Sequence, residues 1–157
     1  MPGCYHGGHV LGQRASAVAC YDPSGTASRV AGVARVDEQS RRALTTDRVI
    51  DITTIGRTSG QPRRKEMWFH NLDGKVYITG VPGTRDWYAN MLANPDFTFH
   101  LKESTQADLP ARAHPITDPE ERRSILTTLL ARIGRSPDQV DAWLESSPLV
   151  AVTFEDA

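Results

Sequence analysis

The chain has 157 residues, and its 18 basic and 19 acidic residues give a formal net charge of −1. This length fits one domain of about 100–150 residues with a tail. A 39% hydrophobic share with 24% charged residues argues against a disordered or fibrous chain. The sequence lacks a run of about 18 apolar residues, so no transmembrane helix is predicted, and the near-neutral charge gives no reason to expect nucleic-acid binding.

The charge is unevenly distributed along the sequence. Residues 1–48 carry 6 basic and 4 acidic groups, and residues 49–102 carry 7 and 5. Residues 103–157 carry 5 basic and 10 acidic groups. The near-neutral total is therefore compatible with a local anion site in the basic middle of the chain.

The N-terminal segment shows no sustained hydrophobic periodicity. We expect a disordered tail over residues 1–47, with one marginal helix near Glu38–Thr45. A start assigned too far upstream would also account for such a segment. Cys4, His6 and His9 lie close together, but their spacing matches no zinc motif, so we expect no metal site. The segment shows no secretory signal, which favours a cytoplasmic protein.

From residue 48 to residue 157 the sequence predicts one folded domain. The Asp73-Gly74 pair predicts a tight hairpin turn, because aspartate and glycine tolerate positive φ. Strands are predicted from β-branched or alternating residues over residues 49–55, 65–70, 76–79, 97–101, 106–114 and 149–154.

Helical periodicity predicts three helices within this domain. The first follows Gly80–Gly83, with Thr84 as its cap and Pro95 at its end. The second starts at Asp118 with proline in the next position, and the third repeats this pattern at Ser136. Because hairpin-like links predominate and strict strand–helix alternation is absent, we expect an α+β fold around an antiparallel sheet or barrel.

The loop after the first predicted strand carries four cations and no acid. Gly56 and Gly60 permit tight turns and close approach of a ligand to the backbone. The pattern is not a P-loop, so a phosphate-binding loop and a solvated basic turn are both open interpretations. The side chains that could hydrogen-bond a phosphate or carboxylate are Arg57, Thr58, Ser59, Arg63, Arg64 and Lys65.

A second segment, residues 80–90, runs from a glycine-containing loop into a predicted helix. Unpaired N–H groups at a helix N-terminus favour an anion, and the rings of Trp87 and Tyr88 could flank a planar group; the alternative is that Trp87 is a core residue. His70 and His100 lie in predicted strands, where we expect surface exposure or structural hydrogen bonds. Cations and aromatic rings without a nucleophile suit a bound cofactor.

Two motifs, GRTSGQPR at residues 56–63 and DWYAN at residues 86–90, carry a resemblance to the deazaflavin-dependent nitroreductase family. The resemblance covers about residues 48–154 and implies a split β-barrel, similar to FMN-binding barrels, with inserted helices. It also implies an oxidoreductase that uses the deazaflavin coenzyme F-420. Carried over by motif position, the implied cofactor-binding residues are Arg57, Thr58, Ser59, Arg63, Arg64, Lys65, Met67, Trp68, Gly80, Val81, Pro82, Gly83, Asp86, Trp87, Tyr88, Ala89 and Asn90.

The resemblance implies hydride transfer from the reduced deazaflavin to an electron-poor small molecule, a quinone or a nitro compound. Trp68 and Tyr88 would border this acceptor, and Tyr88 is the candidate proton donor. A quinone acceptor would bring the protein close to a membrane surface. Two alternatives stay open, an FMN-dependent split-barrel reductase and a deazaflavin- or flavin-binding protein without turnover. Split barrels occur as monomers and as dimers, so no oligomeric state is predicted.

Overall fold

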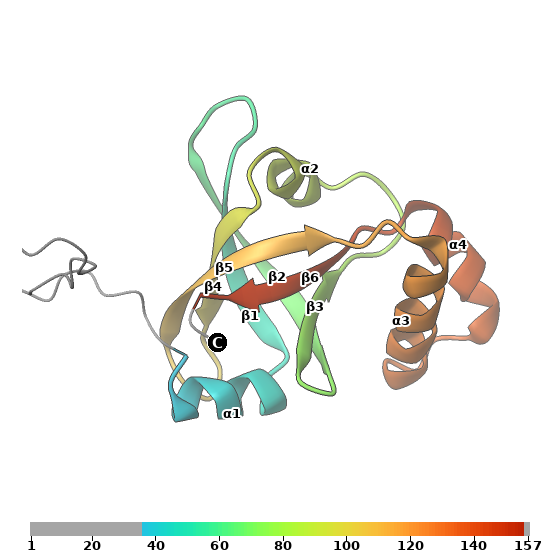
Figure 1. Ribbon diagram of the computed structural model, residues 1–157, viewed down its shortest axis with the longest axis horizontal. Helices are drawn as coiled ribbons and strands as arrows, with labels where there is room; N and C mark the ends of the chain where they lie inside the picture. Colours follow the sequence, from blue (N-terminus) through green and yellow to red (C-terminus); the bar gives the residue numbers. More distant parts are fainter. Residues whose placement is uncertain (1–35, 156–157) are drawn as a thin grey trace, which may run out of the picture. The chain divides into compact units, whose positions relative to one another are not determined.

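The computed structural model describes residues 36–155, which contain a closed barrel of six antiparallel strands. The strands pair in the order β1-β2-β3-β6-β5-β4, and pairing of β1 with β4 closes the barrel (Figure 1). This arrangement confirms the expected α+β split-barrel fold. The strands are β1 (Val49–Ile55), β2 (Pro62–Leu72), β3 (Lys75–Thr79), β4 (Asp96–Leu101), β5 (Ala107–Pro115) and β6 (Leu149–Phe154).

Helices lie between some of these strands and before the first. None of them, among the described residues, is long and apolar enough to cross a membrane. They are α1 (Glu38–Thr46), α2 (Asp86–Ala93), α3 (Pro119–Arg132) and α4 (Val140–Ser146), with a short 3-10 helix (Pro137–Gln139) before α4.

Helix α1 falls inside the stretch that the sequence suggested as a tail. Asp37 caps it by accepting a hydrogen bond from the backbone N–H of Ser40 at 2.7 Å, and burial of Ala43 and Leu44 in the barrel core adds tertiary packing. The expectations for Cys4, His6 and His9 fall on residues outside those that the structure describes.

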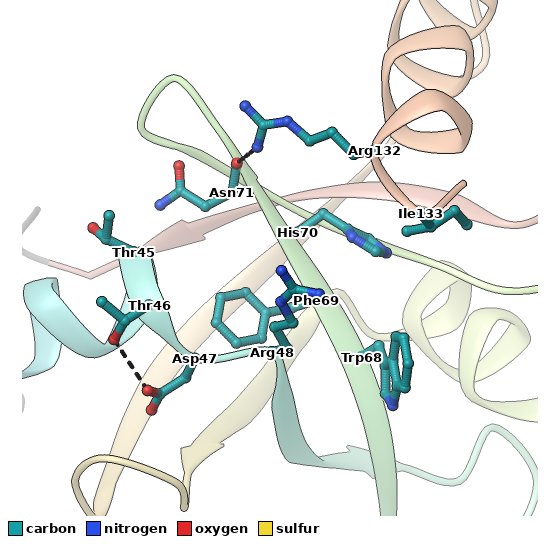
Figure 2. A pocket seen from close by; sticks show the side chains of 10 residues that line it. All are labelled: Thr45, Thr46, Asp47, Arg48, Trp68, Phe69, His70, Asn71, Arg132 and Ile133. Atoms are coloured by element: carbon teal, nitrogen blue, oxygen red, sulfur yellow. Dashed lines mark hydrogen bonds between the residues drawn. The ribbon is translucent and has the colours of Figure 1, made fainter. Parts of the chain in front are cut away.

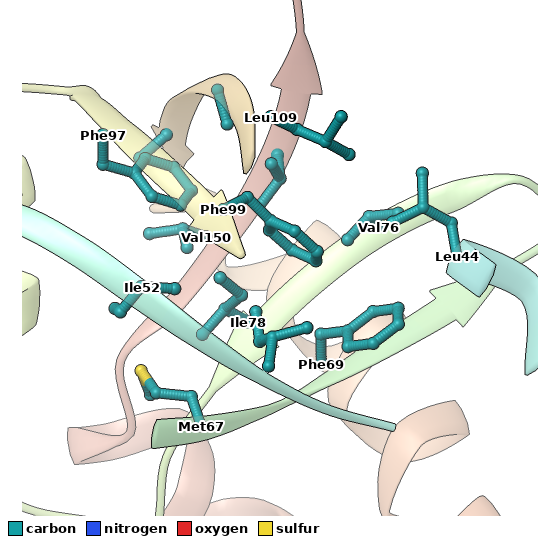
Figure 3. Close-up of a cluster of buried hydrophobic side chains, with 14 of the residues drawn as sticks. Leu44, Ile52, Met67, Phe69, Val76, Ile78, Phe97, Phe99, Leu109 and Val150 are labelled. Carbon is teal, nitrogen blue, oxygen red and sulfur yellow. The ribbon is translucent and has the colours of Figure 1, made fainter. Parts of the chain in front are cut away.

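The barrel core is built from the inward-facing half of each strand, as the period of two predicts. Phe99 lies at its centre, with ring centroids 5.3 Å from Phe69 and 5.2 Å from Phe154 in edge-to-face contacts. Helices α1 and α2 lie near opposite ends of the barrel (Figure 1) and add Leu44 and Met91 to the same cluster. Other members, several of them drawn in Figure 3, are Ile50, Ile52, Met67, Val76, Ile78, Phe97, Leu101, Leu109 and Val150.

A second apolar cluster joins α3 and α4 to the outer face of β3 and β6. Tyr77 and Leu149 come from the strands, and Leu126, Leu130 and Trp143 come from the helices. The helices therefore cover this side of the barrel (Figure 1).

The start of α3 agrees with its prediction, whereas the start of α2 does not. Asp118 caps α3 by accepting a hydrogen bond from the backbone N–H of Glu121 at 2.9 Å. The prediction of Thr84 as cap of α2 is wrong, because Arg85 holds that position and makes no side-chain capping bond. The Arg85 guanidinium donates to the carbonyls of Thr84 and Val81, both at 3.2 Å, and so ties the preceding loop to the helix start.

His100 makes the structural hydrogen bonds expected from its place in a strand. It is only 7% exposed, although its side chain belongs to the outer face of β4. Its Nδ1 lies 2.6 Å from the Asp108 carboxylate and its Nε2 lies 2.7 Å from the Thr53 hydroxyl. The imidazole thus links β1, β4 and β5 across the barrel surface.

A charged cluster on the same outer face links β1 and β2 to the end of β4. Asp51 accepts hydrogen bonds from Arg64 Nε at 2.9 Å and from Lys102 Nζ at 2.7 Å, and Lys102 also contacts Glu66. The Lys102 hydrogen bond, with help from Arg64, holds the pKa of Asp51 below its usual value.

This lowered pKa predicts a pH-dependent contribution of Asp51 to stability. The unfolded chain binds the proton more tightly, so the contribution is present above the ordinary aspartate pKa of about 3.9 and is lost as pH falls through the folded-state pKa. Asp51→Asn should therefore lower the free energy of unfolding at pH 7, and this loss should become smaller toward pH 3. Urea titrations at the two pH values measure it. Asp96→Asn, which removes an exposed pair with Arg112, is the control; an Asp51→Asn effect that is equal at both pH values would contradict the prediction.

Candidate functional site

The end of the β1–β2 hairpin stands out from the barrel beside α2 (Figure 1). Strand β2 pairs with β1 from Pro62 to Trp68, but its pairing with β3 begins only at Phe69. In the described part of the chain, the second edge of β2 is therefore open over residues 62–68. An open edge presents backbone N–H and C=O groups that a ligand can bind.

The hairpin turn is a tight loop whose glycines are required by its geometry. Gly56 N–H donates to the Gln61 carbonyl and Gly60 N–H donates to the Gly56 carbonyl, both at 2.9 Å. Gly60 has φ +64°, and a Cβ at Gly56 would collide with the Ser59 side chain. The two glycines of the first motif thus fix the shape of the loop.

Helix α2 clamps this loop through the second motif. Asn90, which is 4% exposed, accepts a hydrogen bond from Arg57 N–H at 3.1 Å and donates to the Thr54 hydroxyl at 3.2 Å. One turn earlier, Asp86 pairs with the Arg57 guanidinium at 3.2 Å. The two motifs identified in the sequence are therefore in direct contact.

A basic pocket of about 610 Å³ lies between the hairpin and α2. Five of its lining side chains are cations and one, Asp86, is an acid. Arg57 is paired with Asp86 and Arg64 with Asp51, whereas Arg63, Lys65 and Arg85 have no carboxylate partner among residues 36–155. Three uncompensated cations, two on β2 and one at the start of α2, make the pocket suited to an anion.

The structure brings one part of the predicted cofactor residues together in the basic pocket and leaves the other part outside its lining. Those in the pocket are Arg57, Thr58, Ser59, Arg63, Arg64, Lys65, Asp86, Trp87 and Asn90. Those outside its lining are Met67, Trp68, Gly80, Val81, Pro82, Gly83, Tyr88 and Ala89. Lining residues that the sequence did not single out as cofactor-binding are Thr54, Gly56, Thr84 and Arg85.

Strand alternation and helix packing explain this division. Met67 is buried in the barrel core, and Trp68 lies on the opposite face of β2 with 58% of its surface exposed. Trp87 is 4% exposed, so it is chiefly a core residue that reaches the pocket at its edge. The proton-donor candidate Tyr88 is half-buried, packs edge-to-face on Trp87 at 5.9 Å, and lies against the barrel core.

One of the missed residues belongs to a predicted strand. Thr54 lies in strand 49–55 and opposite Arg63 across the hairpin, but because the second strand is predicted to begin at residue 65, the sequence does not pair the two residues. For Arg85, the only indication in the sequence is its position directly before the second motif. Gly56 was noted for its turn but not assigned to the site.

The fold and the basic pocket define a split-barrel protein with a site for an anionic ligand. A family model described as F-420H₂-dependent quinone reductase matches residues 28–139, and the chain belongs to this family. The resemblance noted in the two motifs is thereby confirmed, and the protein is an oxidoreductase of the F-420-dependent type.

Solved structures that resemble this chain support the same fold. A conserved hypothetical protein from Mycobacterium tuberculosis is 19% identical, with 77% of this chain and 82% of that chain covered and a TM-score of 0.62. An F-420 reductase is 18% identical, with 73% of this chain and 91% of that chain covered and a TM-score of 0.54. A putative pyridoxamine 5′-phosphate oxidase from Listeria innocua is 12% identical, with 74% of this chain and 94% of that chain covered and a TM-score of 0.51.

The pairing of Asp86 with Arg57 predicts that Asp86 opposes anion binding. Asp86→Asn should raise the affinity for pyrophosphate about two- to fivefold, because it frees a guanidinium and removes the acid from the pocket lining. Isothermal titration at low salt measures this change. Asp141→Asn releases Arg123 in the same way on the surface of α3 and should have no effect; equal affinities of wild type and Asp86→Asn would contradict the prediction.

The buried side chain of Asn90 predicts a structural cost when it is truncated. Asn90→Ala should lower the free energy of unfolding by about 1–3 kcal/mol, because it leaves Arg57 N–H and the buried Thr54 hydroxyl without their partners. Urea titration measures the change. Asn94→Ala at the end of α2 removes only a local 3.3 Å bond to Asp96 N–H and should cost less; an equal cost for both variants would refute the clamp.

Proposed function

We propose that the protein binds reduced coenzyme F-420 with its anionic part in the basic pocket and passes a hydride to an electron-poor acceptor, a quinone or a nitro compound. The observation that carries this proposal is the pair of cations, Arg63 and Lys65, that face the pocket without carboxylate partners among residues 36–155. Family membership supports a deazaflavin as the anion.

The donor set of the pocket fits phosphate and carboxylate groups. Arg63 can donate two parallel hydrogen bonds to one such group, and Lys65 adds a compact positive charge two residues along the strand. Thr58 and Ser59 add hydroxyl donors from the loop. Since Asn90 already holds the loop in place, little conformational freedom would be lost on binding.

The open edge of β2 offers a path from the pocket toward Trp68. Lys65 and Trp68 are three residues apart, roughly 10 Å along a strand, and their side chains point to opposite faces. A long ligand anchored in the pocket would therefore pass around the open edge to reach the exposed indole. The bound coenzyme supplies the hydride chemistry. The protein would orient the planar group along the strand edge and limit the access of water there.

Cofactor titration of an Arg63 variant tests this proposal. Arg63→Ala should weaken binding of coenzyme F-420 about 10- to 100-fold, the value of a charge-assisted contact of about 1.5–3 kcal/mol. Fluorescence titration of the deazaflavin measures the affinity. Arg123→Ala, which removes an exposed arginine of α3, is the matched control; unchanged affinity in Arg63→Ala would refute the placement of the anion.

Two further measurements separate the proposal from its alternatives. Tighter binding of FMN than of coenzyme F-420 in a competitive titration would favour an FMN-dependent reductase. Stopped-flow oxidation of the bound reduced coenzyme by menadione and a nitroaromatic tests turnover directly. A rate no faster than that of the free coenzyme with every acceptor would favour a binding protein without turnover.

A further inference from the structure

A second, smaller crevice lies on the outer face of β2, where the ends of α1 and α3 approach it (Figure 2). Its volume is about 170 Å³, close to that of a protein cavity that accommodates benzene. Trp68 and His70 project from the same face of β2 because they are two residues apart. The crevice shares no lining residue with the basic pocket.

Two guanidinium groups from different elements flank this crevice. Arg48 precedes β1, and Arg132 is the last residue of α3. Neither forms an ion pair with a carboxylate within residues 36–155, and the Arg132 side chain donates only to the backbone carbonyl of Asn71, at 2.6 Å. Two cations held beside one cavity without a neutralising acid favour an anion between them.

The one acid in the lining is already engaged. Asp47 accepts hydrogen bonds from the hydroxyl of Thr46 at 3.2 Å and from the backbone N–H and hydroxyl of Ser104 at 3.1 and 2.9 Å. Its carboxylate therefore joins α1 to the segment after β4 and is not paired with either arginine.

The polar group between the arginines is the imidazole of His70. Burial, together with the charges of Arg48 and Arg132, lowers the pKa of His70. The ring is therefore neutral at neutral pH, and it makes no hydrogen bond to another described residue. A neutral imidazole can donate one hydrogen bond to a ligand oxygen.

The exposed indole of Trp68 gives the crevice a flat apolar wall. It is 58% exposed, and the partly buried Ile133 adds apolar surface nearby. A planar ring can stack on an exposed indole, and its charged substituent would then lie beside the arginines.

We propose that this crevice is a second anion-binding site, and that it takes a single-ring organic acid with the ring on Trp68 and the carboxylate facing Arg48 and Arg132. The volume of the crevice favours a ligand with one ring, the indole favours a planar ring, and the two arginines favour a negative charge on the ligand. Trp68 is shared with the path proposed for the coenzyme, but the two arginines are not. The site is therefore tested without coenzyme, so that its failure and that of the proposed function are distinguishable.

Ligand-observed NMR titrations with benzoate test this site. Benzoate should bind in a saturable manner, and benzamide, which has the same ring without the charge, should bind at least about fivefold more weakly. Inorganic phosphate, which has the charge without the ring, should also be weaker. Binding of benzamide or phosphate as tight as that of benzoate would overturn the proposed ligand class.

Matched variants locate the binding. Arg48→Gln and Arg132→Gln should each weaken benzoate binding about three- to tenfold, whereas Arg123→Gln on the same helix as Arg132 should not change it. Circular dichroism confirms that the variants are folded. Binding that survives both crevice variants, or that is lost in Arg63→Ala of the basic pocket, would refute the site.

Discussion

The one-sided pairing of the first half of β2 is the constraint on which the site depends. Strand β2 pairs with β1 over residues 62–68 and with β3 only over residues 69–72, so its first half lies against one neighbouring strand alone. Because the hairpin continues beyond the barrel, residues 62–66 are all exposed and one strand edge is left open.

The period of two then sorts a continuous run of charges into two sets. Arg63 and Lys65 share the face of β2 that continues into the core, whereas Arg64 and Glu66 share the outer face. The outer set is neutralised by Asp51 and Lys102 and stabilises the barrel wall. The other set has no acid across the hairpin, since its neighbours on β1 are Thr54 and Ile52. Along β2, residues in ion pairs of the barrel wall thus alternate with cations that have no carboxylate partner among the described residues.

Local patterns were sufficient for most of the fold. Strand 49–55 and the hairpin turn at Asp73-Gly74 follow from residue types that act over a few positions. For helix α1, local signals such as the Asp37 cap are only part of the stabilisation, because Ala43 and Leu44 pack on a barrel that the local sequence does not describe. The prediction at Thr84 is wrong because capping preferences favour threonine, whereas Arg85 holds the cap position and its guanidinium donates to the carbonyls of Thr84 and Val81 instead of capping the helix.

The site was predictable to the extent that its residues belong to short motifs. The sequence indicated both segments that form the basic pocket, but it could not show that Asn90 joins them through Arg57. A motif match also assigns the same role to consecutive residues. In a strand, however, the side chain of Met67 points into the core and that of Trp68 points outward. Residues carried over from a motif therefore line one pocket in the loop, whereas along the strand that follows they point to opposite faces.

The exposure of Trp68 is the last feature that the strand geometry explains. Helices α3 and α4 cover the outer face of β3 and β6, but α3 ends at Arg132 and does not extend over this part of β2. Removing apolar surface from water is favourable, so a ligand that covers this exposed indole would gain binding free energy. Because the open edge of β2 leads from the basic pocket to the indole and the arginine-flanked crevice lies beside it, both proposed ligands would contact the same strand.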